Sequence, residues 1–155
     1  MHRKHFLRSI LPAGLSFHSM VNLHAGERAA LPEDEPALVV PGYLTKADTI
    51  GISCPAGFIS IEDIQPAVLK LEEWGFVVKP GSTVGKRDFT MGGTDEERLN
   101  DLQQMLDDEN IKAILCARGG YGLVRIIDKL NLQKFIRHPK WIIGFSDITV
   151  MHSHI

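Results

Sequence analysis

The sequence predicts an α/β fold in which a parallel sheet is covered by helices on both faces. Short apolar runs without alternating polar residues recur along the chain, as in strands that are buried on both sides. Segments with apolar residues at helical spacing separate these runs, so strand and helix alternate from Thr49 onwards. The 155 residues, 44% hydrophobic and 23% charged, are typical of one globular domain with a core.

Four short apolar runs are expected to form the strands. They are residues 49–54, 76–78, 111–117 and 141–143. Functional sites of parallel sheets lie beyond the carboxyl ends of the strands. The loop at residues 118–122 and the turn at residues 144–146 both fall at this edge, after consecutive strands.

The helices are expected between these runs. Residues 61–74 carry apolar side chains at helical spacing behind a candidate cap, Ser60. Pro66 is unfavourable inside a helix, so this helix is expected to begin closer to Pro66. Thr94 and Glu97 form a capping-box pattern before a second amphipathic helix. Further helical stretches are predicted at residues 123–130, at residues 131–138 and after Asp147.

The first 41 residues differ from the rest of the chain. A basic start at residues 3–8 and a mildly apolar stretch at residues 10–21 resemble an export signal, loosely of the twin-arginine type. A disordered or misassigned extension is an equal alternative. Residues 31–41, with three prolines and three acids, predict a linker. We therefore expect a leader or flexible extension and linker over residues 1–41, and a cytoplasmic protein, or a periplasmic one if the signal functions.

Composition excludes several classes of protein. The net charge is −2, and no basic patch indicates nucleic acid as a partner. No apolar run reaches the roughly 18 residues of a membrane span. Two cysteines, Cys54 and Cys116, do not make a disulfide scaffold, so we expect both to be reduced and buried.

Ser146 is a candidate nucleophile. Gly144 permits a sharp turn after the strand at residues 141–143, and a helix is expected from Asp147. A serine on such a strand-to-helix turn is held above the edge of the sheet with its hydroxyl exposed. Serine is also a favoured helix cap, so a purely structural role for Ser146 stays open.

The glycine-rich loop Arg118-Gly119-Gly120-Tyr121-Gly122 is a candidate anion site. It lacks both the P-loop lysine and the full dinucleotide-binding spacing. Its glycines leave backbone N–H groups free to point at an anion or a developing oxyanion. A tight turn without a ligand is the alternative.

No convincing general base accompanies Ser146 in the sequence. A helix that starts at Asp147 carries His152 and His154 away from the serine, and His138 lies at the opposite end of the strand. His152 and His154 also make a poor metal signature without further ligands. We expect all three to be surface or partly buried histidines.

Four motifs together resemble the LD-carboxypeptidases, serine peptidases that remove the terminal D-alanine from murein tetrapeptides. The motifs are TIGI (residues 49–52), GTDEER (93–98), ARGGYG (117–122) and GFSDIT (144–149). The resemblance covers about residues 49–155. It implies a three-layer, flavodoxin-like or class I glutamine amidotransferase-like N-terminal domain over residues 42–155, truncated before the family's C-terminal domain.

The resemblance also implies roles for particular residues. Ser146 corresponds to the family's nucleophile. The backbone amides of Gly120 and Asp147 correspond to the oxyanion hole, with Gly119 as a close second choice. Gly119 and Tyr121 are expected to contact substrate, and we infer that Arg118 holds either the loop or a substrate carboxylate. The proline-alanine-glycine at residues 55–57 departs from the serine that many members have after the proline.

The family's histidine and glutamate, which complete the triad, belong to the C-terminal domain. The resemblance therefore implies that residues 1–155 are inactive alone, that a murein peptide is the substrate, and that no metal or organic cofactor is needed. It leaves a homodimer open. The alternatives are a relative that cleaves a peptide-nucleotide antibiotic and confers self-immunity, a non-catalytic anion-binding α/β module, and a chain without an independent fold.

Overall fold

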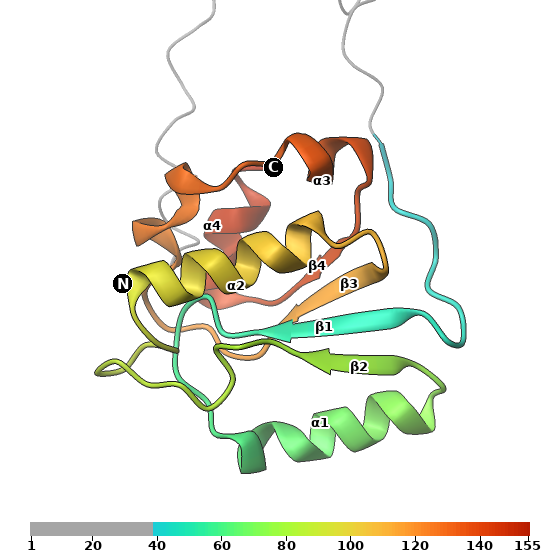
Figure 1. Ribbon diagram of the computed structural model, residues 1–155, viewed down its shortest axis with the longest axis horizontal. Helices are drawn as coiled ribbons and strands as arrows, with labels where there is room; N and C mark the ends of the chain where they lie inside the picture. The colour runs from blue at the N-terminus through green and yellow to red at the C-terminus, as the bar shows by residue number, and fades with distance from the viewer. Residues whose placement is uncertain (1–38) are drawn as a thin grey trace, which may run out of the picture. The chain divides into compact units, whose positions relative to one another are not determined.

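The computed structural model describes residues 39–155, which form a four-stranded parallel sheet with helices on both faces (Figure 1). The strands are β1 (Thr49–Ser53), β2 (Val77–Pro80), β3 (Ile111–Cys116) and β4 (Trp141–Ile143). Their order is β2-β1-β3-β4, and every neighbouring pair is parallel. The predicted fold class is therefore confirmed. The predicted leader and most of the linker, residues 1–38, lie outside the described residues.

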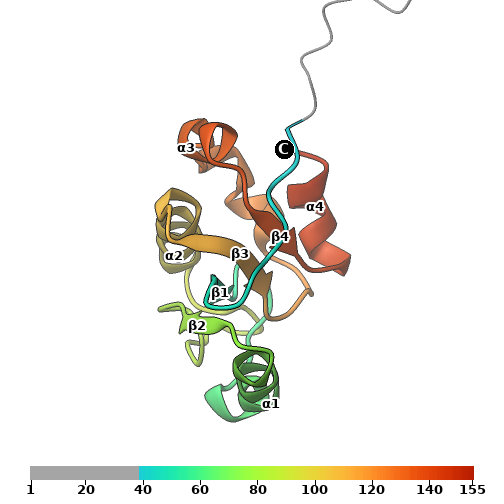
Figure 2. The same cartoon turned by 90° about the vertical axis from the view of Figure 1, so that its right-hand side faces the viewer.

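The helices are α1 (Ile61–Glu73), α2 (Asp95–Asp107), α3 (Gln133–Arg137) and α4 (Thr149–His152). Figure 2 shows α2 and α3 on one face of the sheet and α1 on the other. The connections β1–α1–β2 and β2–α2–β3 cross the sheet in opposite directions, so right-handed crossovers place their helices on opposite faces. Among residues 39–155, no helix has the length and apolar character of a membrane span.

The main core lies on the α2 side of the sheet. Leu102 and Leu106 of α2 pack there with Ile114 of β3, and all three side chains are almost fully buried. Ile148 and Met151, which follow β4, join the same cluster. Each such side chain contributes about 1.5–3 kcal/mol of burial free energy. This packing fixes the segment after β4 against the rest of the domain.

The first helix begins at Ile61, and the expectation that it starts nearer Pro66 is wrong. The Ser60 side chain accepts a hydrogen bond from the backbone N–H of Asp63 and so caps the first turn. Pro66 lies inside α1, where it removes one helical hydrogen bond. The local cap and the burial of Ile64 offset that loss.

Residues 123–130 are less helical than the sequence predicts, whereas the short helical stretch predicted at residues 131–138 is confirmed. Instead of one helix, residues 123–130 form two 3-10 turns, η2 (Leu123–Arg125) and η3 (Ile127–Lys129), and α3 is a single short helix. Ile126 separates the turns with φ −120°. β-Branched residues lower helix propensity here, and tertiary bonds at Leu123 fix the start of the segment.

Candidate active site

Ser146 lies at a sharp turn directly after β4. Its φ is +61°, in the left-handed region that few residues other than glycine adopt. The residue is exposed, and the 3-10 turn η4 (Ser146–Ile148) has no side-chain cap. The alternative that Ser146 is only a helix cap is therefore wrong. A strained turn that presents a serine above the sheet edge has the geometry of a nucleophile elbow.

The glycine-rich loop after β3 lies against this turn. A Cβ atom added to Gly119 would be 2.9 Å from the Cβ of Ser146 and 3.3 Å from its Oγ. Only glycine fits there without displacing the serine. The structure thus brings together the two loops that the sequence placed at the carboxyl edge of the sheet.

Two backbone N–H groups beside Ser146 are available as donors. Among residues 39–155, neither the N–H of Gly120 nor that of Asp147 donates to a backbone or side-chain acceptor. Gly120 is exposed and has φ +111°, a conformation that glycine adopts readily. These are the two amides that the sequence analysis assigned to an oxyanion hole, and that role remains a prediction.

The orientation of the Gly120 amide is fixed from the loop after β1. The N–H of Gly57 donates to the carbonyl oxygen of Gly119, with 2.9 Å between nitrogen and oxygen. The peptide bond is planar and trans, so its N–H and C=O point in opposite directions. The N–H of Gly120 therefore points away from Gly57.

Arg98 of α2 joins three loops around the site. Its Nη1 donates to the carbonyl oxygens of Pro55 (2.7 Å) and Gly122 (2.8 Å), and its Nε donates to that of Gly93 (3.2 Å). The side chain is fully buried and forms an ion pair with Asp95. Burial lowers the pKa of the guanidinium below its ordinary value, and Asp95 opposes this shift.

The Asp147 side chain links the serine turn to the glycine loop. Its Oδ2 accepts a hydrogen bond from the backbone N–H of Leu123 at 2.9 Å. Leu123 directly follows the last glycine of the loop and is fully buried. The carboxylate of Asp147 therefore fixes the far end of the loop, while its backbone N–H remains free.

Arg118 and Tyr121 are exposed on the outer side of the loop. Nη1 of Arg118 donates to the carbonyl oxygen of Phe58 at 3.2 Å, which ties this loop to the loop after β1. Both side chains line a cavity of about 270 Å³ together with Gly119 and Gly120. Two roles were predicted for Arg118. The hydrogen bond to Phe58 supports the first, in which Arg118 holds the loop in place, and the cavity leaves room for the second, in which Arg118 binds a substrate carboxylate.

The three histidines in this part of the chain do not contact Ser146. His152 Nε2 donates to the carbonyl oxygen of Ile142 at 3.1 Å, and His154 follows it on the surface. His138 precedes β4 at the amino edge of the sheet. Within residues 39–155, no side chain forms a hydrogen bond with the Ser146 hydroxyl. The expectation of surface or partly buried histidines is confirmed, since all three are exposed.

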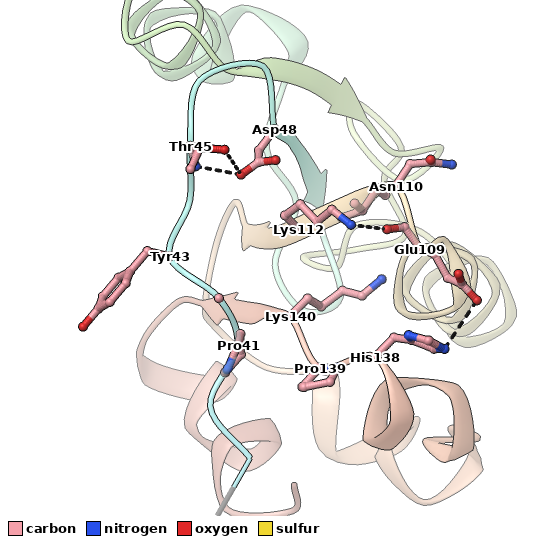
Figure 3. Close-up of a pocket in the computed structure, with 12 residues that line it drawn as sticks. Pro41, Tyr43, Thr45, Asp48, Glu109, Asn110, Lys112, His138, Pro139 and Lys140 are labelled. Carbon is pink, nitrogen blue, oxygen red and sulfur yellow. Dashed lines mark hydrogen bonds and ion pairs between the residues drawn. The ribbon is translucent and has the colours of Figure 1, made fainter.

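A larger cavity, of about 640 Å³, lies at the amino ends of the strands and away from Ser146 (Figure 3). Asp48, Lys112 and Lys140 line it, and each stands at the start of a strand. Lys140 is buried and donates to the carbonyl oxygens of Met105 (2.9 Å) and Asp108 (2.7 Å). Its charge therefore stabilises the C-terminus of α2.

Both cysteines are free and buried, as expected. Burial raises the pKa of Cys54 to about 11 and that of Cys116 to about 12. A thiol with so high a pKa carries little thiolate at neutral pH and makes a poor nucleophile. Although both lie at the carboxyl ends of strands that lead to the site, neither competes with Ser146 for a nucleophilic role.

Several residues around the site were not singled out by the sequence analysis. Gly57 was described only as part of a strand stop, and Arg98 only as part of a motif. A signal for Arg98 was present: it shares the buried face of α2 with Leu102 and Met105, at helical spacing. A charged residue on an apolar face indicates a buried polar contact.

The fold and this turn define a class of protein, a parallel α/β domain that presents a serine at a nucleophile elbow beside a glycine loop. Residues 50–155 match the family model described as the LD-carboxypeptidase N-terminal domain. The chain therefore belongs to the LD-carboxypeptidase family.

The relatives are considerably longer than the matched region. The chain is 40% identical over 115 residues to a probable murein peptide carboxypeptidase of Bacillus subtilis. This match covers 74% of this chain and 36% of the relative. It is 33% identical over 105 residues to the murein tetrapeptide carboxypeptidase of Pseudomonas aeruginosa. This match covers 67% of this chain and 34% of the relative. The chain thus spans little more than a third of the length of these relatives.

A solved structure shares the fold. A variant of the microcin C7 self-immunity protein MccF, in complex with adenosine monophosphate, superimposes with a TM-score of 0.69 at 27% identity. The match covers 74% of this chain and 35% of the MccF chain. The predicted LD-carboxypeptidase-like architecture is confirmed by this similarity.

Proposed function

We propose that this chain is the nucleophile domain of a serine-type LD-carboxypeptidase that hydrolyses the bond to the terminal D-alanine of murein tetrapeptides. The observation that carries the proposal is the left-handed turn at Ser146 with Gly119 packed against it. The murein peptidases named among the relatives support the choice of substrate. This assignment places the enzyme in the turnover of peptidoglycan.

The proposed reaction is acyl transfer. The Ser146 oxygen attacks the scissile carbonyl carbon while a general base takes its proton, and the carbonyl becomes an oxyanion. The N–H groups of Gly120 and Asp147 stabilise that oxyanion. The intermediate collapses to an acyl-enzyme, and the base returns the proton to the departing D-alanine nitrogen. Water then hydrolyses the ester by the same steps.

The general base is proposed to come from outside residues 39–155. The resemblance to the family implies a histidine oriented by a glutamate, from the part of the relatives that this chain does not span. We therefore propose that residues 1–155 alone do not hydrolyse murein peptides. Neither the formation of the acyl-enzyme nor its hydrolysis requires a metal or an organic cofactor.

The test replaces the matched N-terminal domain of the Bacillus subtilis relative with residues 50–155. We expect this chimaera to release D-alanine from murein tetrapeptide, and Ser146→Ala to reduce the rate by at least about 10⁴-fold, as for other serine triads. Ser153→Ala is the matched control, because Ser153 is an exposed serine directly after α4. D-Alanine release is measured by mass spectrometry.

Two outcomes would contradict the proposal. One is a chimaera whose turnover is unaffected by Ser146→Ala. The other is D-alanine release by residues 1–155 alone that disappears in Ser146→Ala, since the base would then lie within this chain.

A second substrate class has specific support, because the MccF structures share this fold. One of them holds aspartyl sulfamoyl adenosine. Cleavage of that compound by the chimaera, without release of D-alanine from murein tetrapeptide, would favour a self-immunity peptidase. Binding of anions without cleavage of either compound would favour a non-catalytic module.

A further inference from the structure

The cavity of about 270 Å³ beside the glycine loop is lined by two arginines. Gly119 and Gly120 contribute to its wall, and the side chains of Arg87 and Arg118 line it as well. Arg87 comes from the long connection between β2 and α2, whereas Arg118 directly precedes the glycines. Two segments far apart in the sequence thus bring positive charge to one small cavity.

Both guanidinium groups interact with Phe58, one with its backbone and the other with its ring. Arg118 donates to the Phe58 carbonyl oxygen, and the Arg87 guanidinium carbon is 5.2 Å from the centre of the Phe58 ring. Within residues 39–155, neither arginine forms an ion pair, although the nearby Arg98 and Arg125 do. Two positively charged guanidinium groups that line one small cavity repel each other. A bound anion is attracted by both groups, and this attraction offsets their repulsion.

The chemistry of the cavity favours a carboxylate. A guanidinium donates two parallel hydrogen bonds, which match the two oxygens of a carboxylate. Ligand cavities for larger molecules measure about 300–1,000 Å³, so this cavity is small for a nucleotide. One amino-acid residue with its carboxylate is a better match.

The cavity also has a suitable position for such a residue. Gly119 borders the cavity, and a Cβ atom added to it would lie 2.9 Å from the Cβ of Ser146. In a carboxypeptidase substrate, the terminal carboxylate is one residue beyond the scissile carbonyl. One residue of chain extends about 3.8 Å. A peptide whose scissile carbonyl is at Ser146 can therefore place its terminal carboxylate in this cavity.

We propose that Arg87 and Arg118 bind the terminal carboxylate of the residue that leaves. This inference rests on the proposed function and extends it, because it explains why cleavage is confined to the last residue of a peptide. Arg87 is then a substrate-binding residue that no local sequence pattern indicates.

The test measures binding by the 155-residue chain, without hydrolysis. A murein tetrapeptide with a free terminal D-alanine carboxylate is compared with its C-terminal amide by NMR titration. We expect the amide to bind at least about tenfold more weakly, since it lacks the charge-assisted hydrogen bonds. Arg87→Gln and Arg118→Gln should each weaken binding of the acid about tenfold and leave that of the amide unchanged.

Control variants separate the loss of carboxylate binding from the effects of losing any surface charge or of unfolding. Arg137→Gln removes an exposed arginine on α3 and should bind both peptides as the original chain does. Arg87→Lys and Arg118→Lys keep the charge but lose the paired donors, so intermediate affinity is expected. Circular dichroism confirms that each variant folds.

Three results would overturn the inference. They are equal affinity for acid and amide, unchanged binding of the acid by the double glutamine variant, and tighter binding of adenosine monophosphate than of the acid peptide. Absence of saturable binding of the acid at millimolar concentration counts against it as well. Acid-selective binding with no D-alanine release by the chimaera would refute the proposed function alone.

Discussion

Gly57 determines where the peptide group between Gly119 and Gly120 lies. Its N–H holds the Gly119 carbonyl, and a Cβ atom added at Gly57 would overlap that same carbonyl oxygen. No side chain can therefore be added at this position unless the peptide group moves. The residue therefore positions a predicted oxyanion donor.

Gly57→Ala should displace the Gly120 N–H from the oxyanion. We expect the chimaera carrying this change to lose about 100- to 1,000-fold in kcat, as when one oxyanion donor is removed, with KM little altered. The measurement is D-alanine release, together with the NMR shift of the Gly120 amide in the 155-residue chain. For the amide shift in the 155-residue chain, Gly42→Ala is the matched control, because a Cβ atom there meets no other atom within 4 Å. Unchanged kcat in Gly57→Ala would contradict the positioning role.

Asp101 connects three elements of the domain through a buried carboxylate. Oδ2 accepts from the hydroxyls of Ser53 (2.8 Å) and Thr83 (2.6 Å), and Oδ1 accepts from the N–H of Ser82 (2.6 Å). The Thr83 hydroxyl oxygen in turn accepts from the N–H of Cys54 at 2.9 Å. Helix α2 is thereby fixed to the end of β1 and to the loop after β2.

Asp101→Ala should destabilise the domain by about 3 kcal/mol. The change leaves several buried donors without an acceptor, and such losses are much larger than the value of one ordinary hydrogen bond. Urea denaturation of the 155-residue chain measures the effect. Asn100→Ala, an exposed change one residue away on α2, should alter stability by less than about 0.5 kcal/mol. Equal stability of the two variants would show that the network contributes little.

The elements that were predicted well are those with local signals. The capping box at Thr94 forms as expected, with the Thr94 side chain accepting from the N–H of Glu97 and the Glu97 side chain accepting in return. Apolar runs identified all four strands. Residues 123–130 were predicted wrongly because their conformation depends on partners distant in sequence, Arg98 and Asp147, which hold Gly122 and Leu123.

The candidate site divides in the same way. Ser146 and the glycine loop were found from local sequence, since a strand followed by glycine and serine is a recognisable pattern. Gly57 and Arg87, for which we propose roles, could not be found, because Gly119 and Phe58, which they contact, are brought to them only by the folded chain. Sequence reasoning finds the groups that carry chemistry more readily than the groups that position them.

At the scale of the whole domain, carboxylates at both ends of α2 connect it to other parts of the chain. Lys79 of β2 donates to Asp108 at 2.7 Å, and this bond, the largest cause, lowers the pKa of Asp108 from 3.8 to about 2. A hydrogen bond from Arg125 of η2 is likewise the main reason that the pKa of Asp95 is lowered. Both groups favour the folded state only while they are ionised.

The lowered pKa values of Asp95 and Asp108 determine how the stability of the domain changes as pH falls. A carboxyl whose pKa is lower in the folded state stabilises the fold above its unfolded pKa, and this contribution is lost as pH falls through the folded pKa. Stability should therefore be nearly constant above about pH 5 and should decline between about pH 4 and pH 2. Urea denaturation followed by circular dichroism across this range measures the decline.

Asp108→Asn isolates one contribution to this decline. The variant should be less stable than the original chain at pH 6, and the difference should shrink steadily as pH falls from about 4 through about 2, the folded-state pKa of Asp108. We expect a difference below about 1 kcal/mol, because the Lys79 side chain is 58% exposed and its ion pair is screened by solvent. Lys79→Met should produce the same loss, and the double variant should add little to it. A difference that stays the same between pH 6 and pH 2 would show that Asp108 does not act through its charge.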